Sequence, residues 1–303
     1  MLRILDILEQ VRRIELRANR LVNDTMVGAY LSFFRGRGLD FEELREYIPG
    51  DDVRDIDWNV TYRLGRPFVK KFREERELGV VLAVDISASS QFGSQGLTKR
   101  EFAVEVAATL AFSAAKSCDK AGLLLFTDRT ELFLPPRKGR RHLLRIIREM
   151  LAFQAHHAGT DIPSALGFLN HALPRRSLVF LFTDFLHSFE NETRNSVSRR
   201  DMVQEIGLTN ARHDLVCVHL CDPREQNMPD AGLLTLEDIE TGELVELDSA
   251  RGSVRDQYAR FNASRLATLD RALRRAGVDT LRLNITEPYA QVLQHFFEHR
   301  RWR

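Results

Sequence analysis

The sequence predicts an α/β protein with a doubly wound, mostly parallel sheet, preceded by an N-terminal helix and a small, turn-rich, partly β subdomain. After residue 77, short apolar runs alternate with amphipathic segments, and the runs are almost wholly apolar. Such runs are typical of parallel strands covered by helices on both faces. Before residue 77 the chain is irregular, charged and rich in turn residues. We therefore expect two parts, residues 1–77 and residues 78–303.

Apolar runs bounded by turn residues predict the strands, at Val80–Val84, Gly122–Phe126, Glu131–Leu134, Leu178–Thr183, Leu215–Leu220 and Thr280–Asn284. Helical spacing predicts the helices between them, at Lys99–Lys116, Arg141–Phe153, Ile162–Ala172, Asp201–Ala211, Val254–Ala276 and Tyr289–His299. The segment "LLTLEDIETGELVELDS" has a turn-like "ETGE" centre and predicts an antiparallel hairpin between the fifth strand and its helix.

Composition excludes several classes of protein. The 303 residues carry a net charge of +1, which argues against a protein that coats nucleic acid. No apolar run approaches the ~20 residues of a membrane span. The first segment, "MLRILDILEQVRRIELR", carries charges throughout and has the spacing of an amphipathic helix rather than a secretory signal. We expect a cytoplasmic protein.

Side-chain oxygens follow two of the predicted strands. Asp85, Ser87 and Ser89 occupy alternate positions after the first strand, and Asp184 follows the fourth. In a doubly wound sheet with strand order 3-2-1-4-5-6, these two strands are neighbours at the point where the order reverses, and ligands bind at such points. Thr160 precedes a helix for which Asp161 is the candidate N-cap and Pro163 lies in the first turn.

The predicted site thus contains two carboxylates and three hydroxyls, and neither sulfur nor imidazole. Hard cations such as Mg²⁺ (or Mn²⁺) prefer oxygen ligands. The set leaves a coordination position free for a carboxylate of a partner protein. The alternative is a purely structural role, in which these residues only cap helices and form turns.

Two other candidates are weaker. Thr127 and Asp128 repeat the "FTD" of the fourth strand, but lie between two strands that resemble an edge hairpin. The second candidate is a zinc site formed by Cys217, His219 and Cys221, which are residue types that bind zinc. Because all three lie on one apolar strand, their side chains cannot easily converge on one metal ion, so buried thiols are the preferred interpretation. The odd number of cysteines and the absence of CxxC favour a reducing compartment.

A second unusual segment, "GRGLDFEELREYIPGDDVRDIDW", contains four aspartates within seven residues after a predicted Pro49-Gly50 turn, namely Asp51, Asp52, Asp55 and Asp57. A metal or nuclease site, contact between nucleic acid and the basic run that follows, and a partner-docking surface are all open alternatives. The preferred interpretation is an Arg–Asp network that pins the subdomain against the neighbouring sheet.

The predicted site resembles the metal-ion-dependent adhesion site (MIDAS) of von Willebrand factor A domains, which have a Rossmann-like fold. It shares with that site the pattern D-x-S-x-S after the first strand, a Thr before a middle helix and an Asp after the fourth strand. The resemblance covers about residues 78–300. It implies that Ser87 and Ser89 are direct metal ligands, and that Asp85, Thr160 and Asp184 bind directly or through water. Phe185 stands where that family usually has a small residue.

The N-terminal block resembles bacterial domain-of-unknown-function family 58. The matching residues are Phe34, Gly36, Gly38, Phe41, Arg45, Tyr47, Pro49, Gly50, Asp51, Asp52, Arg54, Ile56, Asp57 and Trp58. Many members of that family begin with two transmembrane helices, which this sequence lacks, so it resembles the shorter members. The resemblance implies an adaptor or co-chaperone of a MoxR-type AAA+ ATPase.

Three functions follow for the α/β part. The preferred one is a non-enzymatic, magnesium-dependent module that binds a partner protein, without nucleic acid or a membrane span. A haloacid-dehalogenase-like phosphohydrolase would also place an Asp at the end of a strand, but it needs a second Asp two residues on, where this chain has Ser87. The third is a structural scaffold whose metal site stays empty.

Overall fold

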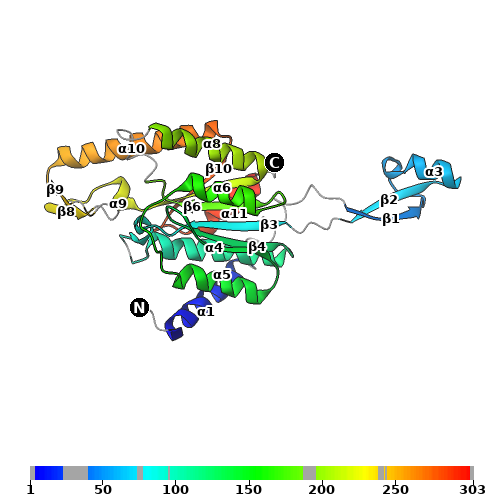
Figure 1. Ribbon diagram of the computed structural model, residues 1–303, viewed down its shortest axis with the longest axis horizontal. Helices are drawn as coiled ribbons and strands as arrows, with labels where there is room; N and C mark the ends of the chain where they lie inside the picture. The colour runs from blue at the N-terminus through cyan, green and yellow to red at the C-terminus, as the bar shows by residue number, and fades with distance from the viewer. Residues whose placement is uncertain are drawn as a thin grey trace. The chain divides into compact units, whose positions relative to one another are not determined.

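The computed structural model describes residues 4–22, 40–73, 78–94, 96–186, 196–237, 242 and 244–300 (Figure 1). The chain divides into two compact units. The larger unit contains Met1–Phe33 and Leu78–Arg303, and the smaller unit contains Phe34–Glu77.

The helices and strands of the larger unit occur in the order α1 (Ile4–Leu21), β3 (Gly79–Asp85), the short 3-10 helix η3 (Ala88–Gln91), α4 (Lys99–Lys116), β4 (Lys120–Phe126), β5 (Thr130–Arg137), α5 (Arg140–Ala152), α6 (Ile162–Ala172), β6 (Leu178–Thr183), α8 (Ser196–Arg212), β7 (Asp214–Cys221), α9 (Pro223–Gln226), β8 (Leu233–Glu237), β9 (Leu244–Asp248), α10 (Gly252–Arg275), β10 (Asp279–Asn284) and α11 (Tyr289–His299). The smaller unit contains β1 (Asp40–Glu46), the 3-10 helix η2 (Val53–Asp55), α3 (Trp58–Leu64) and β2 (Phe68–Arg73).

The main sheet has six strands in the order β10-β7-β6-β3-β4-β5. Its first four pairings are parallel, and only the edge strand β5 is antiparallel to its neighbour. The predicted doubly wound order is confirmed. Because β3 lies between β4 and β6, the chain order reverses beside β3, where ligands bind in this class of fold.

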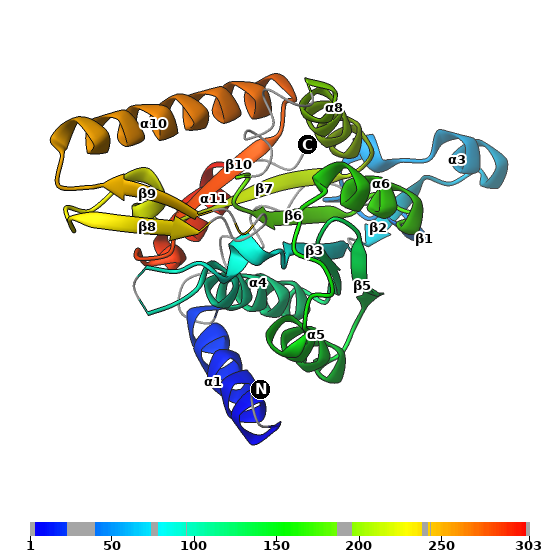
Figure 2. The same cartoon turned by 60° about the vertical axis from the view of Figure 1, so that its left-hand side comes forward.

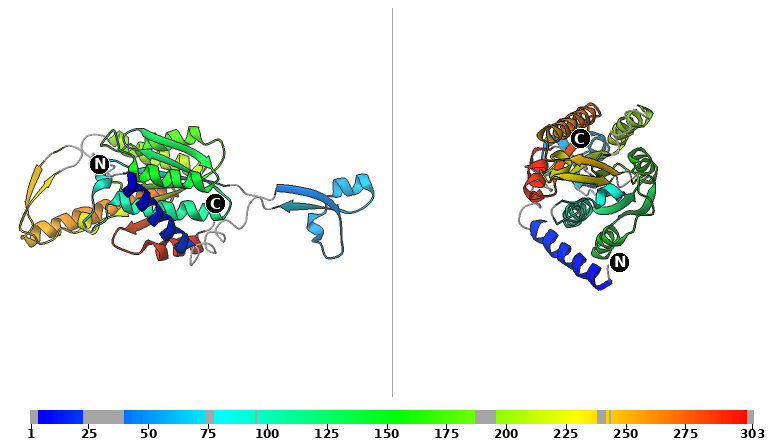
Figure 3. Two further views of the ribbon diagram at one scale, coloured as in Figure 1. Left: turned by 90° about the horizontal axis from the view of Figure 1, so that it is seen from below. Right: turned by 90° about the vertical axis from the view of Figure 1, so that its left-hand side faces the viewer.

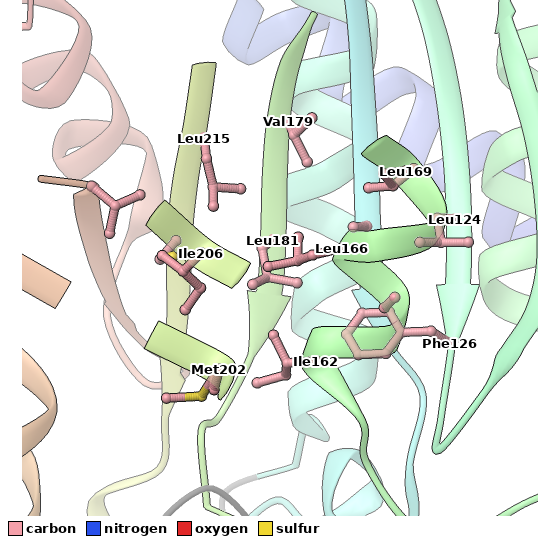
Figure 4. Packing of buried hydrophobic residues seen from close by; sticks show 14 of the residues in the cluster. Leu124, Phe126, Ile162, Leu166, Leu169, Val179, Leu181, Met202, Ile206 and Leu215 are labelled. Atoms are coloured by element: carbon pink, nitrogen blue, oxygen red, sulfur yellow. The ribbon is translucent and has the colours of Figure 1, made fainter. Parts of the chain in front are cut away.

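Helices cover both faces of the sheet (Figure 2). On one face, Ile162 and Leu166 of α6, Ile206 of α8 and Leu269 of α10 pack against alternate strand residues in one buried cluster (Figure 4). On the other face lie α4, α5 and α11, which contact the strands of the sheet. The four central strands β3, β4, β6 and β7 are buried at every position or at all but one. Because helices cover both of their faces, their sequences do not alternate between apolar and polar residues.

Helix α1 belongs with the larger unit. It packs on α4 and α5 (Figure 3), and Arg17 donates to Glu105 of α4 at 2.5 Å. The sequence predicts a first part of residues 1–77 that includes this helix, whereas the small unit of the structure is Phe34–Glu77.

Strands β8 and β9 pair antiparallel, as the hairpin predicted from the sequence requires. The predicted "ETGE" turn itself lies mostly outside the described residues.

In the small unit, β1 and β2 form an antiparallel pair. Asp57 accepts from the backbone of Asn59 and caps α3, and Asp52 caps η2 by accepting from Arg54 N. Asp51 accepts from Arg45 at 2.6 Å and from Ile48 N at 3.0 Å, and these two donors hold the pKa of its carboxyl below the usual value. These carboxylates are therefore engaged in local turns and caps, and Asp51 also pairs with Arg45. An Arg–Asp network that pins the subdomain against the neighbouring sheet stays a prediction.

Within the part of the chain described above, we find no helix long and apolar enough to cross a bilayer.

Candidate metal centre

Two aspartates stand at the carboxyl ends of neighbouring parallel strands. Asp85 is the last residue of β3, and Asp184 directly follows β6. Val84 and Phe182 are register partners, so Asp85 is level with Thr183 and Asp184 lies one residue further along. Both side chains are buried, and the charge of Asp184 helps to raise the pKa of Asp85. The sheet therefore brings the two predicted carboxylates together at its reversal point.

The loop after β3 folds its hydroxyls back over Asp85. Asp85 Oδ1 accepts from Ser87 N at 2.9 Å, an Asx-type turn that starts η3. Ser90 Oγ donates to the Ser87 carbonyl at 2.7 Å and closes the loop. The hydroxyls of Ser87 and Ser89 then lie 3.2 Å apart. The alternate spacing of D-x-S-x-S thus gathers its oxygens on one side of the turn, as predicted.

Thr160 reaches the same place from the loop before α6. Its Oγ1 donates to Asp85 Oδ2 at 3.4 Å. The loop is fixed by backbone bonds on both sides of the threonine, from Ala88 N to Ala158 O and from Asp161 N to Thr127 O, each 2.9 Å long. Asp161 caps α6 as predicted, with its carboxylate accepting from Ser164 N. Three separate loops therefore contribute to one cluster.

Thr183, which the sequence analysis did not select, donates to Asp85 Oδ2 at 2.8 Å. It is the last residue of β6 and is fully buried. A hydroxyl one residue before the strand-terminal Asp184 was the available signal. This bond fixes the rotation of the Asp85 carboxylate toward β6.

The residue after Asp184 adopts an unusual conformation. Phe185 has φ 54°, in the left-handed region that side chains with a Cβ rarely occupy. Its ring is buried and packs edge-on against His219, with centroids 5.6 Å apart. The turn lets Asp184 Oδ1 accept from Leu186 N at 3.0 Å. The positive φ explains why a small residue is common here in the resembling family, and burial of the ring offsets the strain in this chain.

A buried lysine, which the sequence analysis also did not select, lies against the cluster. Lys99, the first residue of α4, is 1% exposed. Its Nζ donates to Asp184 Oδ2 at 2.5 Å and also to Glu225 of α9. A charge at this depth requires partners. The sequence signal was a cation at the first position of a helix, where it opposes the helix dipole and needs nearby carboxylates.

The two aspartates have opposite electrostatic character. Burial, followed by the charge of Asp184, raises the pKa of Asp85 to about 6, although hydrogen bonds from Ser87 and Thr183 act against the shift. Burial pushes the pKa of Asp184 up as well, but the ammonium of Lys99 outweighs it and holds that pKa below the usual value. Asp184 is thus the more acidic member of the pair.

The donor set fits a hard cation in its chemistry. It offers two carboxylates and three hydroxyls, all oxygen, which is what Mg²⁺ and Mn²⁺ prefer. A site built from three or more His, Cys, Asp or Glu side chains does not occur among the described residues, so metal binding here would depend on the hydroxyls. Lys99 already donates to Asp184 from one side.

The two weaker candidate sites predicted from the sequence lie away from this cluster or are buried within a strand. Asp128 lies at the β4–β5 hairpin with 44% of its side chain exposed and pairs with Arg129. Cys217, His219 and Cys221 lie along β7, where alternate residues are separated by about 7 Å, and all three are buried. Burial raises the pKa of both thiols, so they remain protonated. Buried thiols were the preferred interpretation.

Two grooves flank the cluster. One, of about 740 Å³, is lined by Ser87 and Ala88 and by the 151–158 loop. The other, of about 690 Å³, begins at Ser89 and continues between α9, the β8–β9 hairpin and α10. Leu236, Val245 and Phe261 line it and are 40–65% exposed. The cluster therefore lies at the meeting point of two surface depressions.

The fold and the site together define the class of protein. The chain has a von Willebrand A-like domain. Its sheet has six mostly parallel strands with β3 at the reversal point, and helices cover both faces. The D-x-S-x-S, Thr and Asp residues lie at the carboxyl edge of that sheet. The chain belongs to the family described as "Protein of unknown function DUF58", which matches residues 43–268.

The chain is also similar to mycobacterial proteins. The uncharacterized proteins Mb1516 of Mycobacterium bovis and Rv1480 of Mycobacterium tuberculosis are each 30% identical over 293 residues, covering 96% of this chain and 89% of theirs.

Solved structures are more distant. BatB from Bacteroides thetaiotaomicron is 14% identical with a TM-score of 0.45, covering 72% of this chain and 96% of its own. An aerotolerance-related membrane protein from Bacteroides fragilis is 14% identical with a TM-score of 0.47, covering 73% and 96%. The class of fold rests on the strand order and connectivity described above.

Proposed function

We propose that this protein is a non-enzymatic interaction module that binds a carboxylate of a partner protein through Mg²⁺ or Mn²⁺. The family and the fold point to a protein-interaction module. One observation supports the finer proposal: three loops bring Asp85, Ser87, Ser89, Thr160 and Asp184 together at the reversal point of the sheet.

In this proposal the protein side chains hold and orient the cation. Ser87 and Ser89 are the direct ligands, and Asp85, Thr160 and Asp184 bind directly or through water. The cation supplies a coordination position for a carboxylate of the partner. Hydrogen bonds from Thr183 and Ser87 N fix the orientation of Asp85, and the two grooves supply contact area around the central bond.

The residue two positions after Asp85 argues against a phosphohydrolase of the haloacid-dehalogenase type. A phosphohydrolase of the haloacid-dehalogenase type uses an acid two residues after its nucleophilic Asp. Ser87 occupies that position, and its hydroxyl does not supply a proton near neutral pH. Turnover of a generic phosphate ester by the wild type that is lost in Asp85→Asn would contradict this interpretation.

We propose a MoxR-type AAA+ ATPase, or a client delivered to it, as the partner, which makes the protein an adaptor or co-chaperone. The support is the resemblance of the N-terminal signature to the family associated with such ATPases. The near-zero net charge gives no reason to expect nucleic acid.

The test is a binding measurement between the purified full-length protein and the purified MoxR-type ATPase of the same organism, in Mg²⁺ and in EDTA. We expect binding in Mg²⁺ and at least a tenfold loss in EDTA. Ser89→Ala should reproduce the loss, because it removes a proposed hydroxyl ligand from a partly exposed position. The hydrogen bonds that Ser87 N and Thr183 donate to Asp85 stay in place.

The chain provides a matched pair of controls. Asp184→Asn and Asp128→Asn each change the Asp of an "FTD" sequence, but only Asp184 belongs to the cluster. We expect the first variant to lose Mg²⁺-dependent binding and the second to retain it, with circular dichroism confirming that both fold. Equal binding by both variants, or binding that EDTA leaves unchanged, would refute the proposal.

A further inference from the structure

Lys99 lies at a position where burying a charged side chain costs free energy. It is 1% exposed, and it occupies the first position of α4, whose N-terminal dipole repels a cation. Thr98 and Glu101 form a capping box that fixes this end of the helix. The lysine is therefore held at one defined place, and its charge must be balanced there.

Two carboxylates from different elements provide that balance. Asp184 Oδ2 accepts from Lys99 Nζ at 2.5 Å, and Glu225, on the short helix α9, accepts from the same ammonium. Glu225 is itself held, because its Oε2 accepts from Asp222 N at 3.2 Å. Asp222 in turn accepts from Ser94 N and Ser94 Oγ, at 2.8 and 2.7 Å, in the loop that precedes α4. The acceptors thus belong to a fixed frame.

Asp184 is shared between the lysine and the proposed metal site. One of its oxygens accepts from Lys99 and the other from Leu186 N. A divalent cation bound by Asp184 would stand close to the ammonium, and two like charges in a buried environment repel strongly. Glu225 can retain the ammonium when Asp184 turns to another cation, because Lys99 is already bonded to it.

We propose that Lys99 is a built-in competitor of the divalent cation, balancing Asp184 when the metal is absent and passing to Glu225 when the metal binds. The inference rests on the proposed function, since it concerns the same site. Metal binding then becomes an exchange of one cation for another on Asp184. Without the metal, Asp184 keeps a counterion, and the metal affinity is lower than the oxygen ligands alone would give.

The test is isothermal titration of Mg²⁺ and of Mn²⁺ into four full-length proteins: wild type, Lys99→Met, Glu225→Gln and the double variant. We expect Lys99→Met to bind at least tenfold more tightly, because the competing charge is gone. Glu225→Gln should bind several-fold more weakly, because the displaced lysine loses its second partner. In the Lys99→Met background the Glu225→Gln change should alter affinity by at most about twofold.

The double-mutant cycle separates this inference from simple electrostatics. If Glu225 acted only through its charge, its removal would weaken metal binding equally in both backgrounds, and that result would overturn the proposal. Unchanged or weaker binding by Lys99→Met would also overturn it. Lys116→Met, at the exposed far end of the same helix, should match the wild type.

A second readout is thermal stability. Lys99→Met leaves the Asp184 charge without its counterion, so in EDTA it should melt below the wild type and gain more from added Mg²⁺. If that variant does not fold, Lys99→Gln carries the same expectation, since its amide still donates to both carboxylates without a charge.

Failure of the inference and failure of the proposed function look different. If the wild type and Lys99→Met bind the metal equally, the site stands and the competitor role is wrong. If neither protein binds Mg²⁺ or Mn²⁺ at millimolar concentrations, the metal-dependent function itself is wrong.

Discussion

Asp85 and Asp184 illustrate how the surroundings of a residue decide its chemistry. Both follow apolar strands and both are buried. Among the described residues, uncharged groups donate to Asp85, and burial raises its pKa to about 6. Asp184 lies against Lys99, which holds its pKa below the usual value. The same residue type is thus a weaker acid in one place and a stronger acid in the other, and the neighbouring ammonium accounts for much of the difference.

At the residue scale, His213 predicts an acid-dependent loss of stability. It is fully buried, and neither ring nitrogen has a hydrogen-bond partner among the described residues. Burial, with the nearby Arg212 and Arg176, lowers the pKa of His213 to about 4. The imidazole of His213 therefore becomes protonated near pH 6.5 in the unfolded chain but only near pH 4 in the folded protein. The free energy of unfolding consequently falls as the pH drops from about 6.5 to about 4.

Urea unfolding of His213→Leu at pH 7.5 and pH 5 tests this expectation. The loss of stability between the two pH values should be smaller than in the wild type by about 1–2 kcal/mol. His171→Leu, a change of an exposed histidine, should leave the pH dependence as it is. A His213→Leu protein with the wild-type pH dependence would show that this imidazole is not a buried neutral group.

At the scale of elements, the site is a product of loop anchoring. Each of the three contributing loops is fixed through backbone groups, Ser87 N to Asp85, Ala88 N to Ala158 O and Leu186 N to Asp184. Helix α4 adds Lys99 only because it begins at that residue. The position where a helix starts therefore determines which charge lies against the site.

Thr98→Ala tests the start of α4. Thr98 Oγ1 accepts from Glu101 N at 3.1 Å, and the Glu101 side chain accepts from Thr98 N at 2.9 Å. Removing the cap should cost about 1 kcal/mol in the free energy of unfolding, measured with urea. Thr268→Ala, in the exposed interior of α10, should change stability by less than about 0.5 kcal/mol. An equal effect of both substitutions would contradict the role of the cap.

At the scale of the whole molecule, two compact units share one chain. The small unit has few buried side chains, and none of the residues of α3 is buried. Its turn depends on Asp51, which bonds Arg45 and Ile48 N. The larger unit has its own core on both faces of the sheet. Each unit is therefore expected to respond to substitution by itself.

Hydrogen exchange of Asp51→Ala checks this independence. Amides of residues 40–73 should exchange at least tenfold faster, because the turn that connects β1 to η2 loses its carboxylate acceptor. Amides of β3, β4, β6 and β7 should exchange at the wild-type rate. Faster exchange spread through the main sheet would show that the two units unfold together.

The sequence determined the six strands of the main sheet and their order, because burial on both faces forces apolar runs. It predicted neither the short helix α9 nor the individual elements of the small unit. Helices α4, α6 and α11 begin and end where helical spacing placed them. It also indicated the five oxygen-bearing residues that the structure brings together, since residues that follow neighbouring parallel strands share one edge of the sheet.

Tertiary structure decided what no local pattern contains. Lys99 and Glu225 are 126 positions apart and meet only because α4 and α9 begin at the same edge of the sheet. The packing of α1 on α4 and α5 likewise separated it from the small unit that follows it in sequence. Periodicity and capping report what a segment does with its own neighbours, whereas the charge balance of a buried site depends on elements brought together by folding.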